Sequence, residues 1–159
     1  MSKGLHVSYR SIAFQNDAMD RSFLLSRLVV GGPGRPDGMD SGFYIRPTLF
    51  ADAKNDMAIA QTEISGPVLT SIPFDTEEEA IEISNNTVYG LGSYVQTSDG
   101  AKANRIARKL RCGMVTMNGV DRVAGQSFGG YKQSGIGREG GRHGLEDFLQ
   151  VKSVTGWSQ

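Results

Sequence analysis

The sequence contains little cysteine, no net charge and no long apolar run. Its single cysteine, Cys112, cannot form an internal disulfide, so secretion has no support and we expect a cytoplasmic protein. Seventeen basic residues balance seventeen acidic ones, so no overall field would attract nucleic acid or an anionic membrane. The cleanest apolar runs, such as residues 28–30, are far shorter than the roughly 20 residues of a membrane span. These absences indicate a soluble protein that binds neither nucleic acid nor membranes.

Metal and dinucleotide sites find little support in the local motifs. His6 and His143 are too isolated in the sequence to indicate a metal site, and we expect none. Residues 135–140 match the G-x-G-x-x-G pattern of dinucleotide-binding loops. That pattern should open a βαβ unit and be followed about 20 residues later by an acidic ribose ligand, but the sequence ends at Gln159. We therefore expect no Rossmann site there.

What the sequence does contain is an alternation of strand and helix patterns beyond residue 27. Residues 1–27 show no sustained period and are poorly specified, whereas the pattern sharpens at residue 28. Strands are predicted at residues 28–30, 43–45, 68–72, 91–96 and 114–118, and a strand-like tail ends the chain at residues 151–155. Because helical crossovers join parallel strands, the alternation over residues 68–118 predicts an α/β fold with parallel pairing.

Two helices are predicted between these strands. Thr76 and Glu79 have capping-box spacing, which indicates a helix over about residues 76–85. A second helix begins after Ser98 or Asp99, with apolar residues at i, i+3, i+4 and i+7. Its opposite face carries four basic residues, Arg105, Arg108, Lys109 and Arg111. A solvated helix face explains them better than a nucleic-acid patch, because cations in the last turns complement the helix dipole.

Cys112 follows this helix, and two interpretations of it stay open. It has no histidine nearby in the sequence to act as a base, which favours a structural thiol. The neighbouring arginines could lower its pKa and make it reactive, which is the less favoured alternative. Beyond it, a glycine-rich loop over residues 119–137 leads to a short helix that contains Leu145, Phe148 and Leu149.

Several longer strings occur in a specific order. They are FYIRPTLF at 43–50, QTEISGPV at 61–68, NN at 85–86, YGL at 89–91, GMVTMN at 113–118 and FGGYKQSGIGRE at 128–139. In order and spacing they resemble the C-terminal part of the aldehyde dehydrogenase superfamily, across about residues 28–156. The resemblance implies that residues 28–148 form part of the family's catalytic domain, an α/β fold with a mostly parallel sheet, flanking helices and a C-terminal β tail. Residues 149–159 would be the oligomerisation strand and tail, after a divergent segment at 1–27.

The resemblance also implies a chemistry. In that family a cysteine thiolate attacks the aldehyde, a hydride passes to NAD or NADP, and a glutamate-activated water hydrolyses the thioester. Both residues belong to upstream motifs that this sequence lacks, and the G-Q-S run at 125–127 is followed by Phe128 instead of a thiol. We therefore expect no catalytic residues and a fragment that is inactive alone. The loss of resemblance before residue 28 suggests a truncated or frame-disrupted gene, or a start site placed too late.

The family's cofactor and substrate residues can be carried over at a few positions. Glu63 stands where the family's glutamate holds the nicotinamide ribose hydroxyls, which suits a carboxylate acceptor. Ser65 replaces the aromatic residue that packs beside the nicotinamide, so some apolar surface is missing. Gln126 and Phe128 are candidates for lining the aldehyde tunnel, and Ser127 replaces a proline there, which makes the loop less rigid.

Three functional hypotheses follow. The first is the aldehyde dehydrogenase fragment, with NAD or NADP as the family's cofactor. The second is an interaction module that uses residues 150–155 to pair with itself or with a full-length relative, since the family's last strand joins a neighbouring subunit's sheet; a frayed terminus is the alternative. The third, ranked last, is a reactive-thiol or nucleic-acid role for residues 105–112.

Overall fold

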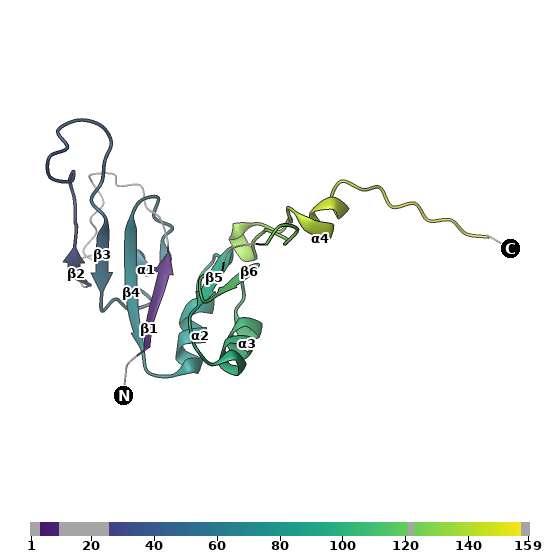
Figure 1. Ribbon diagram of the computed structural model, residues 1–159, viewed down its shortest axis with the longest axis horizontal. Coiled ribbons are helices and arrows are strands. Elements are labelled where there is room, and N and C mark those ends of the chain that lie inside the picture. The colour runs from purple at the N-terminus through teal and green to yellow at the C-terminus, as the bar shows by residue number, and fades with distance from the viewer. Residues whose placement is uncertain (1–3, 10–25, 121–122, 157–159) are drawn as a thin grey trace. The chain divides into compact units, whose positions relative to one another are not determined.

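This computed structural model describes residues 4–9, 26–120 and 123–156, with only the backbone described for residues 4–9 (Figure 1). The chain divides into two compact units, residues 1–87 and residues 88–159. Most of the poorly specified N-terminal segment, residues 1–3 and 10–25, lies outside the described residues, as does the side chain of His6. None of the described helices is long and apolar enough to cross a membrane.

The first unit contains a four-stranded sheet in the order β1-β4-β3-β2 (Figure 1). Its strands are β1 (Gly4–Tyr9), β2 (Arg27–Val30), β3 (Thr48–Ala51) and β4 (Val68–Phe74), and its helices are α1 (Ala58–Gln61) and α2 (Glu77–Asn85). β3 and β4 are parallel, whereas β1 pairs with β4 and β2 pairs with β3 in antiparallel directions. The sheet is therefore mixed, with its parallel pair at the centre.

The core of this unit lies between α1 and the two central strands. Phe50 of β3, Ile59 of α1, Val68 of β4 and Ile64 from the loop between α1 and β4 form one buried cluster. Ile59 and Ile64 are each 1% exposed. A second cluster, Ala53, Ala60 and Ile72, shares Met57 with the first. The short helix α1 is thus held by apolar contacts, because one helical turn has little stability of its own.

The second unit is built on a βαβ arrangement. Strands β5 (Gly92–Val95) and β6 (Met114–Met117) are parallel and joined by α3 (Gly100–Lys109). The parallel pair with its helical crossover confirms the α/β prediction for this segment. The chain continues through a glycine-rich loop to the short 3-10 helix η2 (Lys132–Ser134) and to α4 (Gly141–Glu146).

Local capping signals were confirmed at both long helices. The Thr76 side chain accepts a hydrogen bond from the Glu79 amide at 3.1 Å, and the Glu79 carboxylate accepts one from the Asp75 amide at 2.8 Å. Asp99, one of the two predicted caps of α3, accepts from the Lys102 amide at 3.0 Å. The Glu79 and Lys102 amides lie in first turns, where a helix leaves its amides without intrahelical partners, and these caps satisfy them.

Some predicted strands were placed wrongly. Residues 43–45 are not a strand, and the strand lies beyond Pro47 as β3. Phe43 and Tyr44 are exposed in a loop that Arg46 braces with bonds to Asp37 at 2.9 Å and to the Arg35 carbonyl at 2.7 Å. β4 belongs to a different hydrogen-bonded sheet from β5 and β6. Residues 151–156 carry no strand in this single chain.

Candidate functional site

The candidate cofactor residue, Glu63, lies in the short loop between α1 and β4. Ile64 is buried in the core, whereas Glu63 and Ser65 on either side of it are exposed. The Ile64 side chain is thus directed into the core while the residues on both sides of it are exposed to solvent. The Glu63 carboxylate and the Ser65 hydroxyl, both predicted as site groups from the sequence, are therefore accessible to a ligand.

Both ends of this loop are fixed by hydrogen bonds. At its start, the side-chain nitrogen Nε2 of Gln61 donates to the backbone carbonyl oxygens of Asn55 at 2.6 Å and Asn86 at 3.0 Å. At its end, the Thr48 amide donates to the Pro67 carbonyl at 2.8 Å, which joins the loop to β3. Glu63 thus projects from a loop that is anchored to three other segments of the first unit.

The Glu63 carboxylate fits a ribose ligand chemically. Within the described part of the chain, no hydrogen bond or ion pair engages it. An ionised carboxylate has two oxygens that act only as acceptors, and a ribose offers two adjacent hydroxyl donors. Ser65 beside it supplies a hydroxyl and no aromatic surface. This edge of the first unit could bind a sugar diol, but it offers little apolar area to a ring.

The candidate tunnel residues lie in the second unit. Phe128 is half-buried and forms an antiparallel bridge with Glu139, in which each amide donates to the other's carbonyl at 2.7 Å. Gln126 is exposed, and its side-chain oxygen accepts from the Val123 amide at 3.1 Å. The Ser127 hydroxyl is buried without a hydrogen-bond partner in the described structure. Phe128 is therefore fixed by backbone pairing, whereas Gln126 braces its own turn.

This loop packs directly on the backbone at the start of β6. A Cβ atom placed on Gly113 would lie 1.7 Å from the Gly129 carbonyl oxygen, so no larger residue fits. The Gly90 carbonyl accepts from the amides of both Gly113 and Tyr131, at 3.0 and 2.8 Å. Glycine at these positions lets the 125–141 segment approach β5 and β6 closely enough to position Phe128.

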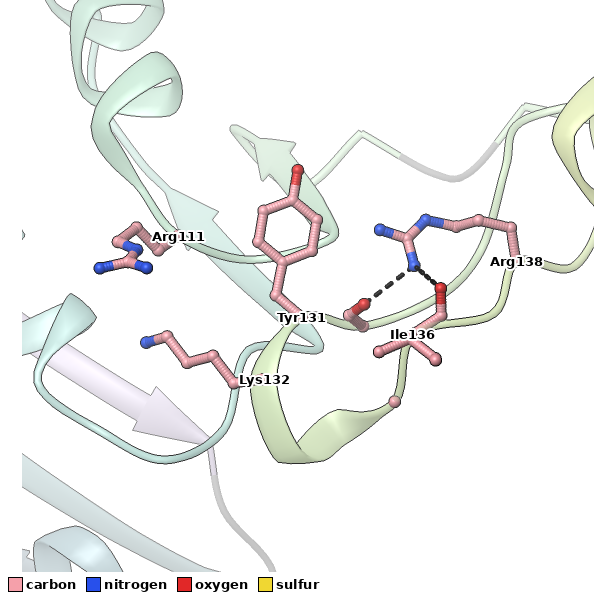
Figure 2. A pocket seen from close by; sticks show the side chains of 7 residues that line it. Arg111, Tyr131, Lys132, Ile136 and Arg138 are labelled. Atoms are coloured by element: carbon pink, nitrogen blue, oxygen red, sulfur yellow. Dashed lines mark hydrogen bonds between the residues drawn. The ribbon is translucent and has the colours of Figure 1, made fainter.

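Tyr131 and Arg138 form a contact that the sequence did not predict (Figure 2). The Arg138 guanidinium lies 5.4 Å from the centre of the Tyr131 ring and donates to the carbonyl oxygens of Gly130 at 2.9 Å and Gly137 at 2.8 Å. Arg111 and Lys132 line the same open hollow, on the other side of the ring. The string FGGYKQSGIGRE contained these residues, but nothing in its pattern indicated that Arg138 closes the loop.

Neither Cys112 nor His143 is among the residues that line this hollow. Cys112 is 9% exposed, and its thiol donates to the Met114 carbonyl at 3.0 Å. His143 lies 3.4 Å from the Glu146 carboxylate on the exposed face of α4. No group of three or more His, Cys, Asp or Glu residues in the described chain is arranged to hold a metal ion.

The model of the aldehyde dehydrogenase family matches residues 24–154. The chain belongs to this family. A Staphylococcus saprophyticus protein whose name assigns it provisionally to the aldehyde dehydrogenases is 48% identical over 132 residues, which are 83% of this chain and 28% of that protein. The chain therefore spans about 28% of the length of this curated relative.

Solved aldehyde dehydrogenases confirm the α/β fold of a partial catalytic domain. The Bartonella henselae enzyme is 49% identical with a TM-score of 0.80, and the match covers 83% of this chain and 28% of that one. Aldehyde dehydrogenase C of Pseudomonas syringae, solved with NAD+ and octanal, is 46% identical with a TM-score of 0.81 over 84% and 28% of the two chains. The Mycobacterium tuberculosis enzyme, solved with NAD+, is 49% identical with a TM-score of 0.79 over 87% and 29%. At the level of the aldehyde dehydrogenase family, these complexes support NAD as the cofactor.

Proposed function

We propose that this chain supplies one part of an aldehyde dehydrogenase site, in which an aldehyde is oxidised to a carboxylic acid with NAD or NADP. Glu63 would hold the ribose hydroxyls of the cofactor, and Gln126 and Phe128 would line the path of the aldehyde. The observation that carries the proposal is the exposed Glu63 carboxylate in a loop anchored at both ends, inside the family match. The bound cofactor would supply the acceptor for the hydride.

We further propose that these 159 residues do not oxidise aldehydes by themselves. Their one thiol, Cys112, is buried and bonded to a backbone carbonyl, so it is a poor candidate for a nucleophile. The purified chain is incubated with octanal or acetaldehyde and NAD+ or NADP+, and the absorbance of the reduced nicotinamide is followed. We expect no rise above a sample without protein, and sustained turnover would overturn this proposal.

We also propose a cytoplasmic location, which the single unpaired cysteine supports.

The role of Glu63 is tested in a chimera. Residues 24–154 replace the matching segment of the Staphylococcus saprophyticus relative, and the steady-state kinetics with varied NAD+ are measured. Glu63→Gln weakens hydrogen bonds to a charged acceptor, which are worth about 1.5–3 kcal/mol. We expect kcat/KM for the cofactor to fall roughly tenfold to a hundredfold. Glu78→Gln, at an exposed glutamate of α2, is the matched control and should change little.

The kinetics of this chimera separate two failures. If the chimera is active and Glu63→Gln matches the control, the ribose role of Glu63 is wrong. If the unsubstituted chimera folds, as its thermal unfolding would show, and yet has no activity, the segment is not a competent part of an aldehyde dehydrogenase site. Ser65→Phe in the same chimera should lower the KM for NAD+, because it restores apolar surface beside the ring.

A second candidate function is self-association through the C-terminal segment. The described tail carries three strongly exposed apolar residues, Phe148 at 86%, Val151 at 98% and Val154 at 68%. Contiguous exposed apolar surface often marks a site of protein association. We propose that residues 150–155 add as a strand to a second copy or to a related subunit. Sedimentation velocity should show a dimer that Val151→Asp disrupts, and a chain that remains monomeric at about 100 μM with no complex formed with the relative would count against this role.

A further inference from the structure

One edge of β4 pairs with β1. β1 and β4 pair antiparallel over six residue pairs, from Gly4 opposite Phe74 to Tyr9 opposite Leu69. The other described strand pairs contain three or four. Yet β1 lies outside residues 24–154, which match the aldehyde dehydrogenase family. The longest ladder in the described chain is thus formed by a segment that the family match does not include.

β4 needs a partner strand on this edge. On its other edge, β3 pairs only with residues 68–70, and the Ala53 amide adds one bond to the Ser71 carbonyl. With β1 in place, Thr70, Ser71 and Ile72 are all buried. Buried backbone amides and carbonyls are costly to leave unpaired, at about 1–3 kcal/mol for each group. Among the described strands, β1 is the one that pairs with residues 69–74 on this edge.

We propose that this edge of β4 is a binding site for an extended peptide strand, and that residues 4–9 are its intramolecular ligand. Recognition rests on the backbone ladder, as in other complexes where a peptide adds a strand to a sheet edge. The segment suits that task, since Gly-Leu-His-Val-Ser-Tyr alternates apolar and polar residues and contains no proline. An occupied edge also prevents pairing with a strand of another chain.

The covalent connection makes this occupation favourable. Residues 10–26 join β1 to β2 in the sequence, so pairing of the ligand strand with β4 is an intramolecular event, and a covalently linked ligand can reach an effective concentration in the millimolar range. A free peptide of the same sequence must compete with the tethered copy. It should therefore bind well only when the tethered copy has been removed.

The experiment uses a chain that lacks residues 1–9 and a fluorescent peptide of residues 2–10. We expect the peptide to bind this shortened chain, measured by fluorescence anisotropy, and to bind the intact chain at least about tenfold more weakly. A peptide with Val7→Pro and Ser8→Pro should not bind. Neighbouring amides of an antiparallel strand point alternately toward and away from the partner, so two adjacent prolines remove at least one ladder bond. Equal binding to both chains, or none to a shortened chain that keeps its circular dichroism, would overturn the proposal.

If the shortened chain does not fold, hydrogen exchange of the full-length chain tests the same proposal. In the intact chain, amides within residues 4–9 and 69–74 should include slowly exchanging positions. The double variant Val7→Pro/Ser8→Pro should speed the exchange of residues 69–74 by at least about tenfold, whereas Val7→Ala/Ser8→Ala should preserve the ladder bonds. If residues 4–9 exchange at the rate of an unstructured peptide in the intact chain, the edge is not occupied in this way and the proposal is wrong.

Discussion

Ile64→Ala is the substitution that tests the link between the core and the candidate site most directly. Ile64 is 1% exposed and packs in the cluster of Phe50, Ile59 and Val68, while its neighbour Glu63 faces solvent. The change removes three buried carbons, worth about 2.4 kcal/mol at about 0.8 kcal/mol each. The unfilled cavity raises the expected loss in the free energy of unfolding to about 3–4 kcal/mol. That is a large fraction of the 5–15 kcal/mol typical of a domain.

Urea unfolding followed by far-ultraviolet circular dichroism measures this loss. The midpoint should shift to lower urea while the slope of the free energy against urea stays the same. Ser65→Ala is the matched control, because it changes the adjacent exposed position and should alter stability by less than about 0.5 kcal/mol. The chain forms two compact units, and Ile64 lies in the first. The loss should therefore appear in the unfolding transition of residues 1–87.

Two results would refute this reasoning. A loss below about 1 kcal/mol for Ile64→Ala would mean that the side chain does not fill a packed site. An equal loss for Ile64→Ala and Ser65→Ala would mean that the loop is not oriented by burial of its central residue. In either case the outward direction of Glu63 would need another explanation.

Three further substitutions or treatments test other parts of the structure. Gly113→Ala should lower the thermal midpoint of the second unit by several degrees, because a Cβ would collide with the Gly129 carbonyl at 1.7 Å; Gly100→Ala, with nothing within 4 Å, should be neutral or stabilising. Thr76→Ala should cost about 1 kcal/mol in urea unfolding by removing the cap of α2, and a loss below about 0.2 kcal/mol would contradict the capping role. Cys112 should react with a thiol reagent at least about tenfold faster in denaturant than in the native chain, since it is 9% exposed, and equal rates would show that it is accessible.

Several elements could be predicted from the sequence because their signals are local. The helix α2 is specified by Thr76 and Glu79, whose capping bonds depend on neighbours three residues apart. Likewise, the βαβ arrangement of β5, α3 and β6 follows from the spacing of apolar residues, which changes from a strand pattern to a helix pattern and back along the chain. In these segments, local preference and tertiary structure agree, and the predicted and observed boundaries are close.

Other elements depend on contacts that no local pattern contains. Residues 43–45 look like a strand by composition, but pairing with β4 begins at Thr48, beyond the proline. The strand β1 was missed because residues 1–27 as a whole show no period, although residues 4–9 alternate when taken alone. The Arg138 contact with Tyr131 joins residues that their loop brings together. The position of β3, the formation of β1 and the Arg138–Tyr131 contact all depend on residues that are distant in the sequence or brought together by a loop.

The orientation of Glu63 does not depend on the side chain of its neighbour Ser65. Three features orient Glu63: burial of Ile64, the Gln61 bonds at the loop's start and the Pro67 bond at its end. None of them involves Ser65, which is exposed. A substitution at Ser65 therefore changes the surface beside the carboxylate without removing the support of the carboxylate. For this reason Ser65→Phe should change the affinity for the cofactor and leave the stability of the first unit nearly unchanged, whereas Ile64→Ala should reduce both.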